Sequence, residues 1–215
     1  MQTDELRARL RDPDWTVRQA AAEALGRARD PAVLEDLLAA ADDENAWVRC
    51  AALEALALLP DPRSWPVLRR GLQDADWNVR LRAVGAVVAL ADPAGAADLV
   101  PLLEDPSELV AAAAADALGT VGGAPALAAL ERLADTPRWQ SREWAAVALG
   151  HLGAPGVALL ARLLHDPKFH VRRRAAEALA RIANPEAKRA LAGALEDRDW
   201  RVQETARDAL REREP

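Results

Sequence analysis

The sequence of residues 12–26 is DPDWTVRQAAAEALG, and variants of it recur along the chain. Six of the seven copies are anchored by a valine that arginine usually follows, and a second apolar residue stands eight positions after each anchor, as Leu25 does after Val17. Consecutive anchors are 30 or 31 residues apart. The seven anchor positions are Val17, Val48, Val79, Val110, Ser141, Val171 and Val202. A period this regular predicts a solenoid, in which each unit packs against its neighbours and function depends on an extended surface.

The anchor segment of each repeat has the pattern of an amphipathic helix. Apolar residues follow Val17 at the third, fourth, seventh and eighth positions, which places them on one helical face. A helix-capping residue stands three positions before the anchor in five of the seven repeats, at Asp14, Asn45, Asp76, Ser107 and Asp199. The other two repeats have Arg138 and Lys168 there.

A second helix is expected ahead of each anchor helix. Pairs such as Asp30-Pro31 and Asp61-Pro62 are typical of a helix start, because proline fits the first turn and aspartate accepts from its free N–H groups. We therefore expect an all-α, right-handed superhelix of seven helix pairs that forms one domain over residues 1–215, with polar helices at both ends. The expected repeats are 3–29, 30–60, 61–91, 92–122, 123–153, 154–183 and 184–213.

Composition and charge narrow the function classes. The hydrophobic content is 51% and tyrosine is absent. The net charge is −6, which disfavours non-specific nucleic-acid binding. The start of the chain has no apolar signal-peptide core and no segment suits a membrane span, so we expect a cytoplasmic protein. We also expect the protein to be monomeric when no partner is bound. Lys168 and Lys188 are the only lysines beside 26 arginines, which fits either a GC-rich genome or a heat-tolerant protein.

The repeated motif resembles HEAT repeats, and more narrowly the phycobilisome-lyase HEAT-like subtype. The resemblance rests on Asp-x-x-Trp-x-Val-Arg-x-x-Ala-Ala-x-Ala-Leu-Gly, which residues 12–26 match almost completely and residues 166–179 (DPKFHVRRRAAEAL) nearly so. It covers almost the whole chain. Such repeats mostly serve as binding scaffolds, so the resemblance is specific for architecture and weak for function.

In that family, the aspartate five positions before the anchor and the arginine after the anchor form a hydrogen-bonded ladder between neighbouring repeats. The same row could instead be a basic track for a ligand. The matching ladder residues here are Asp12, Arg18, Asp43, Arg49, Asp74, Arg80, Arg142, Asp166 and Arg172, with further aspartates at Asp105 and Asp197.

The fourth repeat departs from the pattern. Ala111 stands where the ladder arginine is expected, and Thr136 replaces the aspartate of the following repeat. Pro101 lies within the expected first helix, where it removes a backbone hydrogen bond. We expect a kink or a change of curvature between residues 93 and 125; the alternative is sequence drift that a redundant array tolerates.

The family resemblance implies that the anchor helices line a concave face. Groove positions would then lie two and one before the anchor and two, three, six and ten after it. Aromatic residues fill several of these positions, which is a pattern typical of interaction sites, although each ring could instead pack on the next repeat. These residues are Trp15, Trp47, Trp77, Trp139, Trp144, Phe169 and Trp200.

Acidic residues recur six positions after the anchor and could contact a basic segment of a partner. Local pairing is the alternative, as for Glu23 with Arg27 and for Glu177 with Arg173 or Arg181. Glu54 and Asp116 have no arginine four residues away in either direction, so we expect them to be the better partner contacts.

No catalytic, cofactor or metal motif stands out. His151, His165 and His170 lack metal-ligand spacing, and Cys50 has no second cysteine to pair with. The leading hypothesis is a non-enzymatic scaffold that binds a protein or peptide. The alternatives are a lyase or isomerase acting on a bilin carried by a partner protein, as the subtype's name implies, and a DNA-binding HEAT-like protein.

Overall fold

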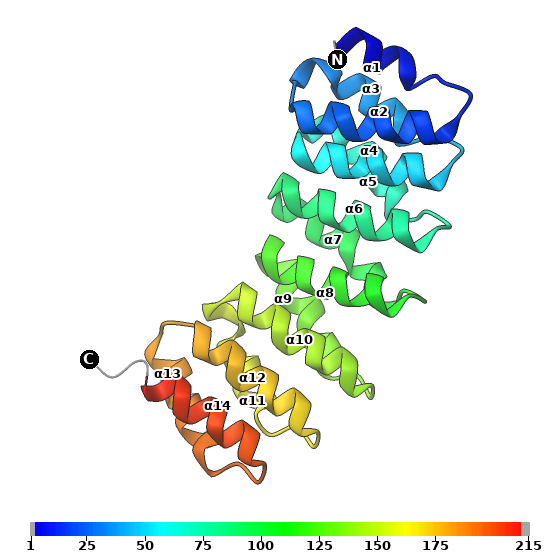
Figure 1. The fold of residues 1–215 in the computed structure, drawn as a ribbon. Helices are drawn as coiled ribbons and strands as arrows, with labels where there is room; N and C mark the ends of the chain where they lie inside the picture. Colours follow the sequence, from blue (N-terminus) through cyan, green and yellow to red (C-terminus); the bar gives the residue numbers. More distant parts are fainter. Residues whose placement is uncertain (1–2, 212–215) are drawn as a thin grey trace. The chain divides into compact units, whose positions relative to one another are not determined.

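The computed structural model describes residues 3–211. The chain divides into two compact units, residues 1–113 and residues 114–215, which we call the N-unit and the C-unit. The expectation of a single domain over residues 1–215 stays a prediction. In residues 3–211 there are fourteen α-helices and no strand (Figure 1). None of these helices is long and apolar enough to cross a membrane.

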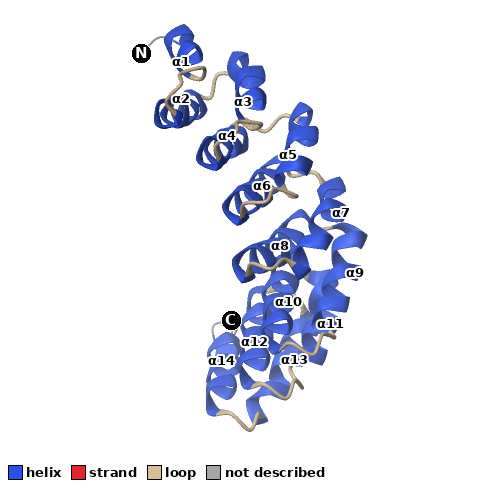
Figure 2. Ribbon diagram, turned by 90° about the vertical axis from the view of Figure 1, so that its right-hand side faces the viewer, coloured by secondary structure: helices blue, strands red, loops and turns tan. Residues whose placement is uncertain are grey.

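In the N-unit, first and second helices of each repeat alternate along the chain. The first helices are α1 (Thr3–Arg9), α3 (Leu34–Ala40), α5 (Trp65–Gly71) and α7 (Ala96–Leu99). The second helices are α2 (Trp15–Ala28), α4 (Ala46–Leu58), α6 (Trp77–Leu90) and α8 (Glu108–Val121), and α8 contains the boundary between the units. Helices α2, α4 and α6 pack in sequence as one layer, and α1, α3 and α5 form the other (Figure 2).

The C-unit repeats the same arrangement. Its first helices are α9 (Gly123–Ala134), α11 (Val157–Leu163) and α13 (Pro185–Gly193), and its second helices are α10 (Trp139–Leu152), α12 (Phe169–Arg181) and α14 (Trp200–Arg211). Helix α12 packs between α10 and α14, and each first helix packs against its own second helix. The predicted all-α array of helix pairs is therefore confirmed. The expected end of the seventh repeat at residue 213 lies outside the described residues.

The apolar positions of the repeat form the core. The anchors Val48, Val79, Val171 and Val202 are fully buried, and so are the leucines eight positions after most anchors, as Leu149 shows. Alanines fill the remaining face of each second helix, which brings neighbouring second helices close together.

Six short 3-10 segments adjoin the α-helices of the described residues, and the first five of them contain a proline. They are η1 (Pro31–Val33), η2 (Pro62–Ser64), η3 (Pro93–Gly95), η4 (Val100–Glu104), η5 (Ala154–Gly156) and η6 (Ala194–Glu196). The carboxylate of Asp30 accepts a hydrogen bond from the N–H of Ala32 at 2.9 Å, and Asp61 and Asp92 do the same in their own repeats. Asp-Pro therefore starts each of these first helices as a capped 3-10 turn, because proline fixes the first turn while aspartate satisfies its free donor.

Helix α7 of the fourth repeat is short, whereas the predicted kink or change of curvature between residues 93 and 125 stays a prediction. Helix α7 ends at Leu99 after four residues, and the chain continues as η4, which contains Pro101. The first helices α3, α5 and α11 have seven residues each. Proline has no N–H for the α-helical bond, so it shortens this helix.

The predicted ladder is present as five arginine–aspartate pairs, which we call rungs. In each rung the Arg Nε donates to the aspartate Oδ2 of the next repeat at 2.6–2.8 Å, and Nη2 donates to Oδ1. The rungs are Arg18–Asp43, Arg49–Asp74 and Arg80–Asp105 in the N-unit, and Arg142–Asp166 and Arg172–Asp197 in the C-unit. The ladder interpretation is confirmed, and the basic-track interpretation is wrong for these arginines because their guanidinium groups are largely buried and paired.

Each rung also fixes the turn before a second helix. Arg49 Nη1 donates to the carbonyl oxygen of Asp43 in its own repeat at 2.9 Å, and Arg18 contacts Asp12 in the same way. The aspartate Oδ1 accepts the N–H two residues later, as Asp74 does from Asp76. Bidentate pairs of this kind hold two groups in one geometry. The rung therefore joins neighbouring repeats and sets where the next helix begins.

Three ladder positions have a side chain other than the expected arginine or aspartate. Gln203 replaces arginine in the last repeat, and its Nε2 still donates to the carbonyl oxygen of Asp197 at 2.6 Å. Ala111 has no donor and Thr136 has no carboxylate, so these two residues cannot form a rung.

Acid should weaken the array by protonating the rung aspartates. The pKa of Asp105 lies below its usual value near 3.8, because it accepts hydrogen bonds from Arg80 and from the N–H of Ser107. Burial would raise the pKa of Asp43, Asp74 and Asp197, but their arginine and backbone hydrogen bonds outweigh burial and lower it. A carboxyl with a depressed folded pKa stabilises the fold above its unfolded pKa and loses that contribution as the pH falls. We expect the urea midpoint to drop steeply below about pH 4.

The matched variant for this experiment is Asp105→Asn. It should be less stable than the wild type at pH 7, and its stability should fall less between pH 5 and pH 3. Identical pH slopes for the two proteins would show that the rungs do not cause the acid sensitivity.

Replacing glycine by alanine should have opposite effects on stability at two positions of the second helices. A Cβ at Gly26 would lie 2.5 Å from Cβ and 2.7 Å from Cα of Ala55 on the next second helix, whereas a Cβ at Gly85 would meet nothing within 4 Å. Gly26→Ala should destabilise the protein by about 1–2 kcal/mol, since overpacking outweighs the gain in helix propensity. Gly85→Ala should stabilise it by about 0.5–1 kcal/mol. Urea unfolding followed by circular dichroism measures both, and two shifts of the same sign would contradict the close packing of α2 on α4.

Candidate functional site

The second helices of the N-unit present the predicted groove positions on one face. Trp15 and Trp77 begin α2 and α6, and Trp47 is the second residue of α4. Each follows a capping residue whose side chain accepts a backbone N–H: Asp14, Asn45 or Asp76. The caps fix the first turn of each helix, so the three indoles stand at the same end of adjacent helices. We call Trp15, Trp47 and Trp77 the tryptophan row.

The tryptophan row is open to solvent. Trp15 is 39% exposed, Trp47 is 55% exposed and Trp77 is 41% exposed. Leu109 of α8 occupies the equivalent end of its helix and is 61% exposed, and the sequence interpretation missed it. Large apolar side chains aligned in this way form the kind of surface that binds other molecules.

Two hollows lie along the same face. One, of about 180 Å³, is lined by Trp47, Cys50 and Glu54 of α4 together with residues of α2 and α6. The other, of about 310 Å³, continues from Glu23, Ala51 and Glu54 toward Leu58. Residues at the second, third and sixth positions after the anchor therefore line the hollows, as the repeat pattern predicts. Gln19, Asn78 and Arg82 also line the first hollow, and only their register in the repeat could have revealed them.

Glu54 faces a cation that local spacing could not reveal. Its carboxylate lies 2.8 Å from Nε of Arg82 on α6, and both side chains are about half exposed. Glu23 pairs with Arg27 at 3.6 Å and accepts from Gln19 at 2.9 Å, as the local-pairing alternative predicts. The sequence analysis considered only arginines four residues from Glu54, whereas Arg82 reaches Glu54 from the next repeat. Exposed pairs of this kind contribute at most about 1 kcal/mol, so a bound partner can replace them.

Asp116 likewise has a partner in the next repeat. His151 Nδ1 lies 2.8 Å from Asp116 Oδ1, from α10 to the end of α8 within the C-unit. The two residues are 35 positions apart in sequence, so helical spacing of four residues does not reveal this contact. Among residues 3–211, no group of three or more histidine, cysteine, aspartate or glutamate side chains could hold a metal ion.

Two aromatic rings in the C-unit, those of Trp139 and Phe169, are covered by other groups of the chain. Trp139 stacks on His170 of the next repeat at 5.2 Å, and Phe169 lies beneath the guanidinium of Arg201 at 3.7 Å. Arg138 lies 5.5 Å from the ring of Trp144. The interpretation that these rings pack on the array therefore holds for Trp139 and Phe169. Trp200 differs, since it is 65% exposed beside Arg201.

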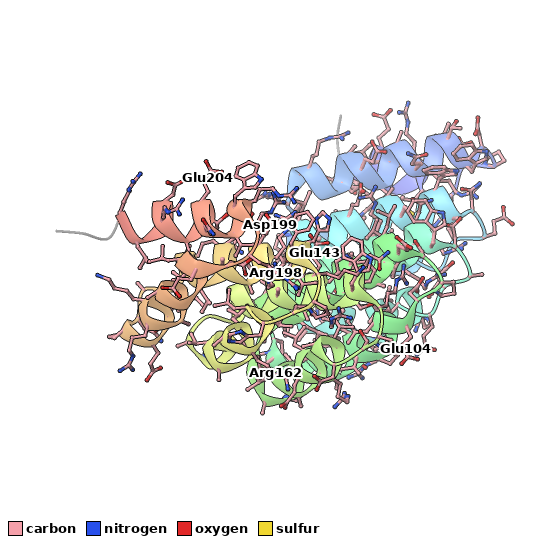
Figure 3. All side chains as sticks on the ribbon, turned by 90° about the horizontal axis from the view of Figure 1, so that it is seen from below. Glu104, Glu143, Arg162, Arg198, Asp199 and Glu204 are labelled. Carbon is pink, nitrogen blue, oxygen red and sulfur yellow. The ribbon has the colours of Figure 1, made fainter. Side chains whose placement is uncertain are left out.

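The basic residues of α12 are also engaged. Arg174 contacts Glu143 at 3.1 Å and Glu177 at 2.8 Å, and Arg173 lies 3.4 Å from Glu177. Asp199, which precedes α14, pairs with Arg201 at 2.8 Å, and this hydrogen bond lowers the pKa of Asp199 to about 2. Figure 3 labels Glu143 of α10, Asp199 before α14 and Glu204 of α14. The C-unit face is thus a network of internal pairs in which Trp200 remains exposed, whereas the N-unit face has three exposed rings on adjacent helices.

Comparison with known proteins gives the family. A family model of HEAT repeats matches residues 3–76, 66–150 and 132–211. The chain belongs to the HEAT-repeat family. None of the curated proteins matches it significantly in a sequence comparison.

Solved structures agree with this assignment of the fold. The complex of CpcE and CpcF of phycocyanin lyase from Nostoc sp. PCC7120 is similar, with 24% identity, coverage of 99% of this chain and 94% of that chain, and a TM-score of 0.62. YibA of Escherichia coli has 21% identity, coverage of 97% and 81%, and a TM-score of 0.63. A designed armadillo repeat protein has 23% identity, coverage of 98% and 99%, and a TM-score of 0.53. At these identities the likeness is one of fold.

The environment of Cys50 gives a test of the hollow. Burial raises the pKa of its thiol to about 11. The thiolate is the reactive form, so at pH 8 iodoacetamide should modify the folded protein on the order of 100-fold more slowly than the urea-unfolded chain. Mass spectrometry of timed samples measures both rates. Equal rates would mean that Cys50 is open to reagents and ionised, contrary to its place in the hollow wall.

Proposed function

We propose that this HEAT-repeat chain is a non-enzymatic scaffold that binds another protein or peptide along its second-helix face, with the tryptophan row of the N-unit as the main contact. The observation that carries the proposal is the alignment of three exposed indoles at one end of adjacent helices, beside hollows that contain polar groups. Tryptophan is enriched among residues that dominate binding energy, because a large rigid ring is desolvated at low entropic cost.

Charge supports a partner with a basic segment. Residues 1–113 contain 20 acidic and 12 basic side chains, a net charge of −8, whereas residues 114–215 contain 14 acidic and 16 basic side chains, a net charge of +2. The tryptophan row therefore lies in the acidic part of the protein. An acidic surface attracts a basic segment over a distance and raises its association rate at low salt.

The groups on this face are suited to binding, and we assign none of them a role in a chemical reaction. Glu54 and Arg82 neutralise each other at 2.8 Å, and the Cys50 thiol is held in its protonated form by burial. The likeness to a phycocyanin lyase concerns the fold, so the proposal does not extend to a chromophore.

Capture of the binding partner from a native cell extract tests the proposal. The triple variant Trp15→Ala, Trp47→Ala and Trp77→Ala should keep its helical content, since the rings are exposed, and should retain at least about tenfold less of any protein that the wild type retains. Arg70→Ala, on the first-helix side of the N-unit, is the control and should retain the same protein as the wild type. If the triple variant captures what the wild type captures, the tryptophan row is not the binding surface.

A further inference from the structure

We infer that the tryptophan row binds an extended segment of its partner in which arginine recurs at every third position. This inference rests on the proposed function and names the chemistry of the segment. The arginine side chains would lie over the indoles of Trp15, Trp47 and Trp77, one for each repeat.

Elsewhere in the chain, arginine side chains lie against aromatic rings. A guanidinium lies 5.5 Å from the ring of Trp65, 5.5 Å from Trp144, 3.7 Å from Phe169 and 5.9 Å from Trp200. Among the described residues no cation lies over a ring of the tryptophan row, although these rings are 39–55% exposed. A guanidinium over an aromatic face makes a favourable cation–π contact. An arginine of the partner can therefore make this contact with the tryptophan row, as the chain's own arginines do with its other rings.

Carboxyl groups near the row favour a cation over a neutral side chain. Asp14 and Asp76 precede Trp15 and Trp77 directly, and Glu54 lies in the same hollow as Trp47. The pKa of Asp14 is lowered by its hydrogen bonds with Thr16, so its carboxylate is ionised at neutral pH. Arginine fits this combination better than lysine, because a planar guanidinium stacks on an indole and also binds a carboxylate through a fork of donors.

The spacing of the repeats sets the period of the segment. Packed helices lie about 8–10 Å apart, and α2, α4 and α6 pack in sequence. A polyproline II chain rises about 3.1 Å per residue and turns once in about three residues, so every third side chain points the same way after about 9 Å. Two residues of a β-strand advance only about 6.6 Å, which is too short to reach the next helix. An extended segment with arginine at every third position therefore matches three adjacent tryptophans.

Synthetic peptides of equal composition test this inference. The first repeats Arg-Pro-Pro four times, and the second has the same twelve residues with its four arginines together at one end. Isothermal titration should show that the periodic peptide binds the full chain at least about tenfold more tightly than the clustered peptide. The triple tryptophan variant should lose at least about tenfold in affinity for the periodic peptide, whereas Trp200→Ala should bind it as the wild type does.

Three results would overturn the inference: equal binding of the two peptides, no binding of either, or an affinity unchanged in the triple variant. These failures are distinct from a failure of the proposed function. If the triple variant loses capture of the native partner while the peptides bind equally or not at all, the scaffold proposal stands and the three-residue period is wrong. Self-association of the chain through this face, detected by sedimentation and abolished in the triple variant, would identify a second copy as the occupant and also overturn the inference.

Discussion

The rung between arginine and aspartate is the constraint on which the other features of this protein depend. One guanidinium holds two carbonyl oxygens of its own turn and both carboxylate oxygens of the next repeat, as Arg49 does with Asp43, Glu44 and Asp74. The carboxylate in turn accepts the N–H that precedes the next helix. Charged groups in this partly buried setting stabilise the fold only when every donor and acceptor is satisfied, and the rung achieves that. Neighbouring second helices consequently start in a common register.

That register explains why the tryptophans form a row. Rung aspartate, cap and tryptophan occur within five residues of one turn, as in Asp74, Asp76 and Trp77. When the rung fixes the turn, it also fixes where the indole emerges. The core requires no tryptophan at this position, because the anchors and leucines already fill the space between helices. The rings are therefore free to contact other molecules.

The two units use similar aromatic residues in different ways. In the C-unit, Trp139 and Phe169 are covered by His170 and Arg201, and acidic and basic side chains are nearly balanced. In the N-unit the rings are open and the charge is acidic. The period of the sequence is the same in both, so the difference comes from the residues that occupy the turn and groove positions. Binding capacity is therefore a property of particular repeats and does not follow from the repeat architecture as such.

The sequence by itself determined the repeat, the helix pairs, the caps at Asp14, Asn45, Asp76 and Asp199, and the interruption of a first helix at Pro101, because each depends on groups close together in the chain. The family resemblance added the pairing of Arg18 with Asp43 and its equivalents. Only the tertiary structure decided the pairs Glu54–Arg82 and Asp116–His151 and the stacking of Arg201 on Phe169. These contacts join residues about one repeat apart through long side chains, and local spacing does not determine which neighbour such a side chain reaches. For the same reason, the sequence did not show that Trp47 is exposed whereas Trp139 is covered, since both residues occupy groove positions.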